Sequence, residues 1–113
     1  MEKFMMIVRE DLGRLSRMSH EERFANTPIM LEWIKGLVES GNYVGGEPLG
    51  VAGCVVRQNE VQTDGPFIEA KECIAGYDIV LAENLNQAVS IAQTCPLVMQ
   101  GIAAREVRPI IEL

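Results

Sequence analysis

The stretch from residue 63 to residue 72 constrains the fold most, because it joins a tight turn to a dense run of charge. It reads Thr63-Asp64-Gly65-Pro66-Phe67-Ile68-Glu69-Ala70-Lys71-Glu72. Gly65 can adopt backbone angles that other residues avoid, Pro66 has a fixed φ angle, and the Asp64 side chain can accept hydrogen bonds from nearby backbone amides. The sequence therefore predicts a chain reversal here, between two segments that have the pattern of β-strands.

The charged residues after this turn support two interpretations. Glu69, Lys71 and Glu72 place acids and a base close together whether the segment is extended or looped. Such a cluster can bind a polar ligand, but a solvated loop between strands has the same composition. The residues alone leave both interpretations open.

Size and charge narrow the class of protein. A chain of 113 residues forms a single domain, 1–113, large enough to bury about two thirds of its unfolded surface. It carries 10 Lys and Arg residues against 16 Asp and Glu residues, which gives a net charge of −6. This charge repels phosphate backbones and anionic membrane surfaces, so we expect neither nucleic acid nor a membrane as a partner.

The cysteines and the first residues bear on the compartment. Cys54, Cys73 and Cys95 are an odd number without CxxC spacing, and each lies in an apolar segment, which favours a reduced compartment. The apolar run from Phe4 to Val8 is too short for a signal peptide or a membrane span. We therefore expect a soluble, cytoplasmic protein.

The first half of the chain predicts one strand and one interrupted helix. Phe4 to Val8 is apolar at every position, which is typical of a strand covered on both faces, and residues 9–18 suit a loop. Ser19 with Glu22 matches a capping box, so a helix is expected from near His20 to Gly41. Its apolar stripe is expected to contain Phe24, Thr27, Met30, Leu31, Ile34, Leu37 and Val38. Pro28 predicts a kink or a restart, with Thr27 as a new cap.

The middle of the chain predicts a cleft wall and a hairpin. Residues 44–53 are rich in glycine and are expected to form an irregular connection that lies against a cleft. The segments 54–57 and 60–63 flank Gln58-Asn59, a pair that favours a hairpin turn.

The second half predicts strand, helix and strand. Residues 73–82 are largely apolar on both faces, and Asn84 with Gln87 predicts a helix N-terminus. The stripe of this helix is expected to contain Leu85, Ala88, Val89, Ala92 and Cys95 and to end at Pro96. The last strand is expected over residues 105–111, with Pro109 at a sheet edge.

This order predicts an α+β, ferredoxin-like βαββαβ domain, in which two helices cover one face of an antiparallel sheet. The strands at 4–8 and 73–82 are apolar on the other face as well. A second copy of the same sheet would cover that face, so we expect a homodimer.

The motif from Thr63 to Glu72 resembles the signature of the DGPF group of YCII-related proteins. Further matching segments are Lys3-Phe4-Met5-Met6-Ile7, Val44-Gly45-Gly46-Glu47, and Cys95-Pro96 followed by Glu106-Val107-Arg108-Pro109. The resemblance implies a dimeric α+β barrel, in a family whose members mostly lack a known activity. Genes of this group resemble those often associated with alternative sigma factors, which implies a regulatory or interaction role as one hypothesis.

Some relatives in the wider YCII superfamily resemble lyases or isomerases that act on ring-derived acids through a His and an Asp. In this chain Met30 stands at or near the His position, and Cys95 stands at the Asp position before Pro96. Neither side chain can replace the acid–base pair, so the resemblance does not carry that activity over. A lyase or isomerase that uses other groups stays open as a third hypothesis.

The first hypothesis is a cleft that binds a small polar or anionic ligand. The candidate ligand-binding residues are Arg9, Arg57, Asp64, Glu69, Lys71 and Glu72. The alternative is an ion-pair network that shapes the loop, in which each exposed pair contributes only about 0–1 kcal/mol. Trp33, Tyr43, Phe67 and Tyr77 could line the cleft or belong to the core.

The remaining chemistry-bearing residues predict no further site. His20 is the only histidine and suits an exposed first helical turn, and Cys95 on an apolar stripe suits packing more than nucleophilic chemistry. The carboxylates have no metal-ligand spacing. We therefore expect no metal and no cofactor.

Overall fold

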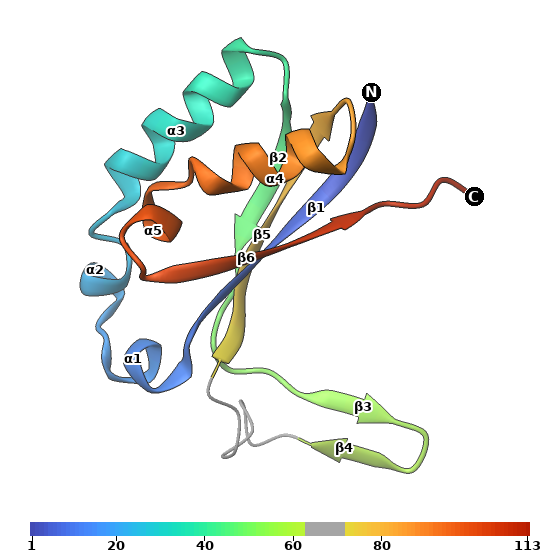
Figure 1. Cartoon of the computed structure of the whole chain (residues 1–113). Helices are drawn as coiled ribbons and strands as arrows, with labels where there is room; N and C mark the ends of the chain where they lie inside the picture. Colours follow the sequence, from blue (N-terminus) through green and yellow to red (C-terminus); the bar gives the residue numbers. More distant parts are fainter. Residues whose placement is uncertain (63–71) are drawn as a thin grey trace.

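A four-stranded antiparallel sheet with helices on one face forms the body of the chain, and a two-stranded hairpin extends from it (Figure 1). The structure is a computed structural model that describes residues 1–62 and 72–113. The predicted turn at Asp64-Gly65-Pro66 therefore lies outside the described residues. Strand order in the sheet is β2-β5-β1-β6, as the predicted ferredoxin-like α+β fold requires.

The strands are β1 (Glu2–Asp11), β2 (Tyr43–Pro48), β3 (Val55–Arg57), β4 (Glu60–Gln62), β5 (Glu72–Ala82) and β6 (Ala103–Pro109). The helices are α1 (Leu12–Arg17), α2 (His20–Arg23), α3 (Thr27–Glu39), α4 (Leu85–Gln93) and α5 (Pro96–Met99).

The centre of the sheet is the long antiparallel pair of β1 and β5, which runs from Glu2 opposite Ala82 to Asp11 opposite Glu72. Both strands were predicted from their apolar runs, and both extend beyond those runs. Phe4, Met6 and Val8 are buried, and they alternate with half-buried residues on the other face. The core therefore lies on the helix side of the sheet.

The main core joins this sheet face to α4. Phe4, Met6 and Val80 pack with Ala88 and Ala92 of α4. The predicted helix N-terminus is confirmed, because the Gln87 amide donates to Asn84 Oδ1 over 2.9 Å. Leu85 and Val89 were predicted on the buried stripe but are exposed, whereas Ala88 and Ala92 of the same stripe are buried.

The predicted loop over residues 9–18 is wrong, because β1 continues to Asp11 and α1 follows at once. Asp11 caps this helix by accepting a hydrogen bond from the Arg14 amide over 2.6 Å. Leu12 and Leu15 are buried beneath it. These two leucines supply the apolar face that makes a short, polar segment helical.

The expected interruption of the next helix is confirmed as a restart. Ser19 and Glu22 form the predicted capping box at the start of α2, which ends at Arg23. α3 begins at Thr27 with Pro28 in its first turn, where proline loses no helical hydrogen bond. The N-cap is Asn26, one residue before the predicted Thr27. The helix ends at Glu39, shortly before the predicted stop at Gly41, which has a positive φ of 81°.

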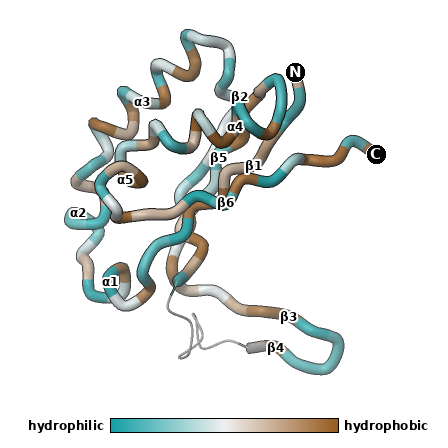
Figure 2. Tube along the Cα trace, in the orientation of Figure 1, coloured by the Kyte–Doolittle hydropathy of each residue, from teal (hydrophilic) through white to brown (hydrophobic). Residues whose placement is uncertain are grey.

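The predicted stripe of this helix is partly wrong. Leu31 and Val38 are each 58% exposed, whereas Met30, Ile34 and Leu37 are half-buried. Phe24 precedes the restart at Asn26 and does not belong to α3. Counting helical turns from Phe24 therefore placed Leu31 and Val38 on the buried face, although both are exposed. Figure 2 shows hydrophobic and hydrophilic segments alternating along α3.

The predicted irregular connection over residues 44–53 is wrong for its first half, because β2 pairs with β5 as an edge strand. A register shift between Tyr43 and Gly45 places Gly46 opposite Asp78. A Cβ atom at Gly46 would overlap Asp78 Oδ1 and the Tyr77 carbonyl oxygen. Glycine is required here for close approach between strands, not for an irregular path.

The predicted hairpin is confirmed as β3 and β4, with Val56 opposite Val61. Neither Gln58 nor Asn59 has a positive φ angle, so the turn does not use the left-handed conformation that Asn tolerates. The hairpin projects away from the sheet and the helices (Figure 1).

The end of the chain departs from prediction only in detail. Pro96 begins the short helix α5 after Cys95, and β6 then runs along the outer edge of the sheet, as Pro109 predicts. The face opposite the helices carries half-buried Met5, Ile7 and Ile79. Among the described residues, no helix has the length and hydrophobicity that crossing a membrane requires.

Candidate functional site

A cavity of about 260 Å³ lies between the sheet and the α2–α3 segment. Its apolar wall includes Met18, Phe24, Met30, Ile34 and Leu97. Its polar groups come mainly from the strands and from α1 and α2. Among them are Glu10, Arg14, Arg23, Tyr43, Glu47, Asp78 and Arg105. The cavity is therefore an apolar space with charged groups at its boundary, as is typical of a small-molecule site.

Asp78 and Arg105 form a buried ion pair in this wall. The Asp78 residue is 7% exposed, and the Arg105 side chain is 3% exposed. Arg105 Nη1 donates to Asp78 Oδ2, while the Tyr43 hydroxyl donates to Asp78 Oδ1 over 2.7 Å. One carboxylate thus joins β5 to β6 and β2.

Arg105 is held from two further directions. Its guanidinium carbon lies 5.1 Å from the centre of the Trp33 ring, and Nη2 lies 3.5 Å from Cys95 Sγ. Its buried Nε has no hydrogen-bond partner among residues 1–62 and 72–113. Arg105 is therefore fixed in place while one of its donors stays unused.

The Tyr43 hydroxyl stays protonated in this setting. Burial raises the pKa of Tyr43 well above its ordinary value, and the hydrogen bond to the Asp78 carboxylate raises it further. Both effects disfavour a phenolate, because it would be desolvated and would face another anion. At neutral pH Tyr43 therefore acts as a donor to Asp78.

A second polar group lies at another part of the cavity wall. Arg23 Nη2 donates to the carbonyl oxygens of Leu49, over 2.5 Å, and Ala75, over 3.2 Å. Its guanidinium carbon lies 5.1 Å from the centre of the Phe24 ring. In the described part of the chain, Arg23 forms no ion pair with a carboxylate.

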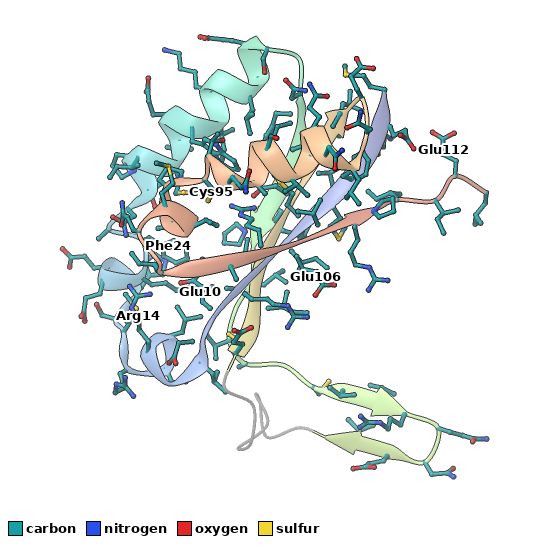
Figure 3. The ribbon with its side chains drawn as sticks, viewed as in Figure 1. Glu10, Arg14, Phe24, Cys95, Glu106 and Glu112 are labelled. Carbon is teal, nitrogen blue, oxygen red and sulfur yellow. The ribbon has the colours of Figure 1, made fainter. Side chains whose placement is uncertain are left out.

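Glu10 and Arg14 complete this region. Arg14 Nη1 lies 3.5 Å from Glu10 Oε1, so these two charges largely compensate each other. Figure 3 shows both side chains on the side of the molecule that carries α1 and α2, with Phe24 on the same side. Arg23 is therefore the cation of this region whose charge is least compensated within the described residues.

Of the six predicted site residues, the structure describes Arg9, Arg57 and Glu72, and none of these three lines the cavity. Arg9 lies on the opposite sheet face, where Nη2 is 2.6 Å from Glu106 Oε1. Glu72 begins β5 close enough to favour the charged form of Arg9, and Arg57 lies in β3 on the hairpin. Asp64, Glu69 and Lys71 lie outside the described residues. Ligand binding by these six residues stays a prediction.

The pair on the opposite face is electrostatically coupled. The hydrogen bond from Arg9 lowers the pKa of Glu106, and the charges of Arg9 and Arg108 lower it further. Alternation along β1 separates this pair from the cavity, because Val8 and Glu10 face the helices and Arg9 faces away.

The chain matches the model of the YCII-related domain over residues 3–111. It belongs to the YCII-related family. A search among curated proteins gives no match. Among solved structures, 5-chloro-2-hydroxyhydroquinone dehydrochlorinase from Burkholderia phenoliruptrix, in complex with 2,5-dihydroxybenzoquinone, has 19% sequence identity and a TM-score of 0.59. The match covers 98% of this chain and 95% of the dehydrochlorinase chain, and it shows a shared fold.

The resemblance places the acid–base pair at or near Met30 and at Cys95. Met30 lines the cavity, and Cys95 is fully buried beside Arg105. Neither offers a carboxylate or an imidazole to a ligand. The titratable groups at the cavity are instead those of β1, β2, β5, β6 and the α1–α2 segment.

Sequence reasoning missed Arg23, Asp78 and Arg105 as site residues and named Tyr43 and Tyr77 only as an aromatic wall. Both tyrosines border the cavity, but Tyr77 lies opposite Ile7, so its side chain is on the sheet face away from the helices, and its backbone is the part near Gly46. Trp33 stacks on Arg105 and does not line the cavity. A signal for Asp78 was present, because it is the one charged residue between Cys73 and Ala82. No described group of His, Cys, Asp and Glu could hold a metal ion.

Proposed function

We propose that this YCII-related domain binds a small polar or anionic organic molecule in the cavity between the sheet and the α2–α3 segment. The observation that carries the proposal is the position of Arg23 in an otherwise mainly apolar wall, without a carboxylate partner among the described residues. Two backbone carbonyls orient its guanidinium, so a ligand carboxylate or phenolate would meet an ordered cation.

The volume limits the size of the ligand. Pockets for drug-sized molecules span about 300–1,000 Å³, and this cavity is smaller at about 260 Å³. A single-ring acid fits such a space better than a nucleotide or a peptide. Met30, Ile34 and Leu97 supply apolar contacts for the ring.

The dehydrochlorinase with the same fold supports this size class, because its ligand in the complex is the single-ring molecule 2,5-dihydroxybenzoquinone. Catalysis in this chain is the finer part of the proposal. It would have to use groups other than Met30 and Cys95, and Asp78 is the buried carboxylate that lines the cavity.

Assembly is a further part of the proposal. A homodimer would cover the sheet face that carries Met5, Ile7 and Ile79, which the helices of the same chain leave open. A regulatory interaction module is the second candidate function, favoured by the projecting hairpin, on which Val56 is 70% exposed.

Ligand-observed NMR with a library of small ring acids, phenols and neutral rings tests the binding proposal. Wild type is compared with Met30→Trp, which fills the cavity from α3, and with Glu32→Gln on the exposed side of the same helix. We expect acids to bind wild type and Glu32→Gln but not Met30→Trp. Binding of no compound, or equal binding to all three proteins, would contradict the proposal.

A further inference from the structure

The ion pair of Asp78 and Arg105 is an unusual element in the wall of an apolar cavity. Desolvation makes a buried pair of charges no more stabilising, in general, than apolar side chains of the same volume. The neighbouring strand β2 nevertheless leaves room for this pair, because Gly46 has no side chain. A larger residue at position 46 would overlap Asp78. The fold therefore tolerates a costly polar cluster at one end of the cavity.

The cluster has unused hydrogen-bonding capacity of both kinds. An ionised carboxylate offers about four acceptor sites, and Asp78 receives one bond on each oxygen, from Arg105 and Tyr43. Arg105 Nε is a buried donor without a partner among the described residues, on a side chain that is 3% exposed. Nε itself has no surface that a water-sized molecule reaches, but a guanidinium has five N–H groups, and in the described residues Nη1 bonds Asp78 and Nη2 bonds Cys95 Sγ, so donor capacity also remains on Nη1 and Nη2. Acceptor and donor capacity thus remain on two neighbouring side chains that both line the cavity.

We propose that Asp78 and Arg105 together bind a hydroxyl group of the ligand, which donates a hydrogen bond to the Asp78 carboxylate and accepts one from Arg105. This inference rests on the proposed function, because it assigns a ligand group to the same cavity. A hydroxyl group suits the cluster because it is both a donor and an acceptor.

Other polar groups suit the cluster less well. An ammonium group has no acceptor for Arg105 and would face a guanidinium that already compensates the charge of Asp78. A second carboxylate would face the Asp78 carboxylate without a donor of its own. Tyr43 cannot offer its proton instead, because that proton is already donated to Asp78.

The position of Arg23 then defines a ligand class. Arg23 is bound to the carbonyl of Ala75, three residues before Asp78 in β5, which corresponds to about 10 Å along a strand. A ligand that reaches both sites carries its acidic group at one end and its hydroxyl at the other. The predicted class is therefore hydroxylated ring acids with the two groups on opposite sides of the ring.

Four single-ring probes separate these possibilities. They are 4-hydroxybenzoate, benzoate, 4-(aminomethyl)benzoate and terephthalate, which place a hydroxyl, no group, an ammonium and a carboxylate opposite the acid. Dissociation constants come from the fluorescence of Trp33, the only tryptophan, which stacks on Arg105. We expect 4-hydroxybenzoate to bind wild type at least about tenfold more tightly than the other three, as for a hydrogen bond to a charged group.

A double variant tests whether the cluster causes this preference. Asp78→Leu with Arg105→Met removes both charges and keeps an apolar side chain at each position. Its probe affinities are measured by NMR titration, and its fold is checked by circular dichroism. We expect a folded protein that binds 4-hydroxybenzoate and benzoate equally, whereas Glu32→Gln keeps the wild-type preference. If the double variant does not fold, Asp78→Asn with Arg105→Gln replaces it, because it also leaves no buried charge while keeping polar groups at both positions. Hydrogen bonds between neutral groups are weaker, so the preference is expected to fall at least about threefold.

Three results would overturn the inference. They are equal binding of 4-hydroxybenzoate and benzoate to wild type, no binding of any probe at millimolar concentration, and a hydroxyl preference that persists without the ion pair. The library experiment with Met30→Trp separates this failure from failure of the proposed function. Ligands that need the cavity but show no hydroxyl preference would overturn only the inference.

Discussion

Arg105 of β6 reaches over β1 to pair with Asp78 of β5. Asp78 lies opposite Met6 of β1, and Arg105 lies opposite Val8 of the same strand, so the pair crosses the central strand diagonally on the helix side of the sheet. This contact joins β5 to β6 across β1, and the Tyr43 hydroxyl extends it to β2. The cluster links the sheet to the cavity wall, and it can be tested as a structural element before any ligand is known.

Removing one partner of this pair should destabilise the fold more than removing both. Arg105→Met leaves the Asp78 charge buried and unpaired, with an expected loss of about 3–5 kcal/mol in the free energy of unfolding. Asp78→Leu with Arg105→Met should cost far less, because no buried charge remains. Urea unfolding followed by circular dichroism measures both. An equal loss in the two proteins would mean that the pair itself stabilises the fold.

Alanine substitutions at Gly46 and Gly45 in β2 form a matched pair of tests. A methyl group at Gly46 would overlap Asp78 Oδ1 and the Tyr77 carbonyl, whereas nothing lies within 4 Å of a Cβ at Gly45. Gly46→Ala should therefore lower stability by about 1–3 kcal/mol, as overpacking does, and Gly45→Ala should change it little. Thermal unfolding under one buffer condition makes the comparison. A similar change in both variants would contradict the proposed close approach of β2 to Asp78.

Tyr43 should ionise only at high pH. Burial and the bond to Asp78 raise the pKa of Tyr43, so its phenolate should appear only at a pH well above the ordinary range for tyrosine. Because the folded-state pKa is raised, the stabilisation is present below the unfolded pKa and is lost as the pH rises through the folded one. Ultraviolet difference spectra of wild type and Tyr43→Phe measure this. If Tyr43→Phe removed a phenolate transition within the ordinary pH range for tyrosine, the assignment would be wrong.

Glu106 should contribute to stability on the acid side. Its pKa is lowered by the hydrogen bond and charge of Arg9, so its contribution is present above the unfolded pKa and is lost as the pH falls through the folded one. Glu106→Gln should therefore flatten the loss of thermal stability below about pH 4.5, the ordinary range for glutamate. Glu32→Gln, on the exposed side of α3, serves as the control. Identical acid profiles for wild type and Glu106→Gln would exclude this role.

Much of the fold could be predicted because its signals are local. The apolar runs of β1 and β5, the capping box at Ser19 and the cap at Asn84 each depend on residues a few positions apart. α1 was missed because its two buried leucines are too few for a periodic pattern. β2 was missed because its glycines serve contact with Asp78, which sequence alone does not reveal.

The site was harder to predict, because its residues are far apart in the sequence and come together only when the strands pair. Tyr43, Asp78 and Arg105 come from three strands, and the sequence gives no direct sign of their contact. Arg9 was chosen as a cleft residue because both faces of β1 are apolar, so alternation could not assign a side. The isolated charge of Asp78 in an apolar strand was the one local sign of the cluster.

The central claim is that the cavity binds a small ring acid, and a titration of the ¹⁵N-labelled protein with 4-hydroxybenzoate tests it most directly. We predict saturable shifts in the amide signals of Tyr43, Gly46 and Asp78, with a shift of the Arg23 side-chain Nε signal. Signals of the hairpin residues Val56 and Val61 should stay unchanged. Shifts confined to the hairpin or to the opposite sheet face, or no shifts at millimolar ligand, would contradict the account.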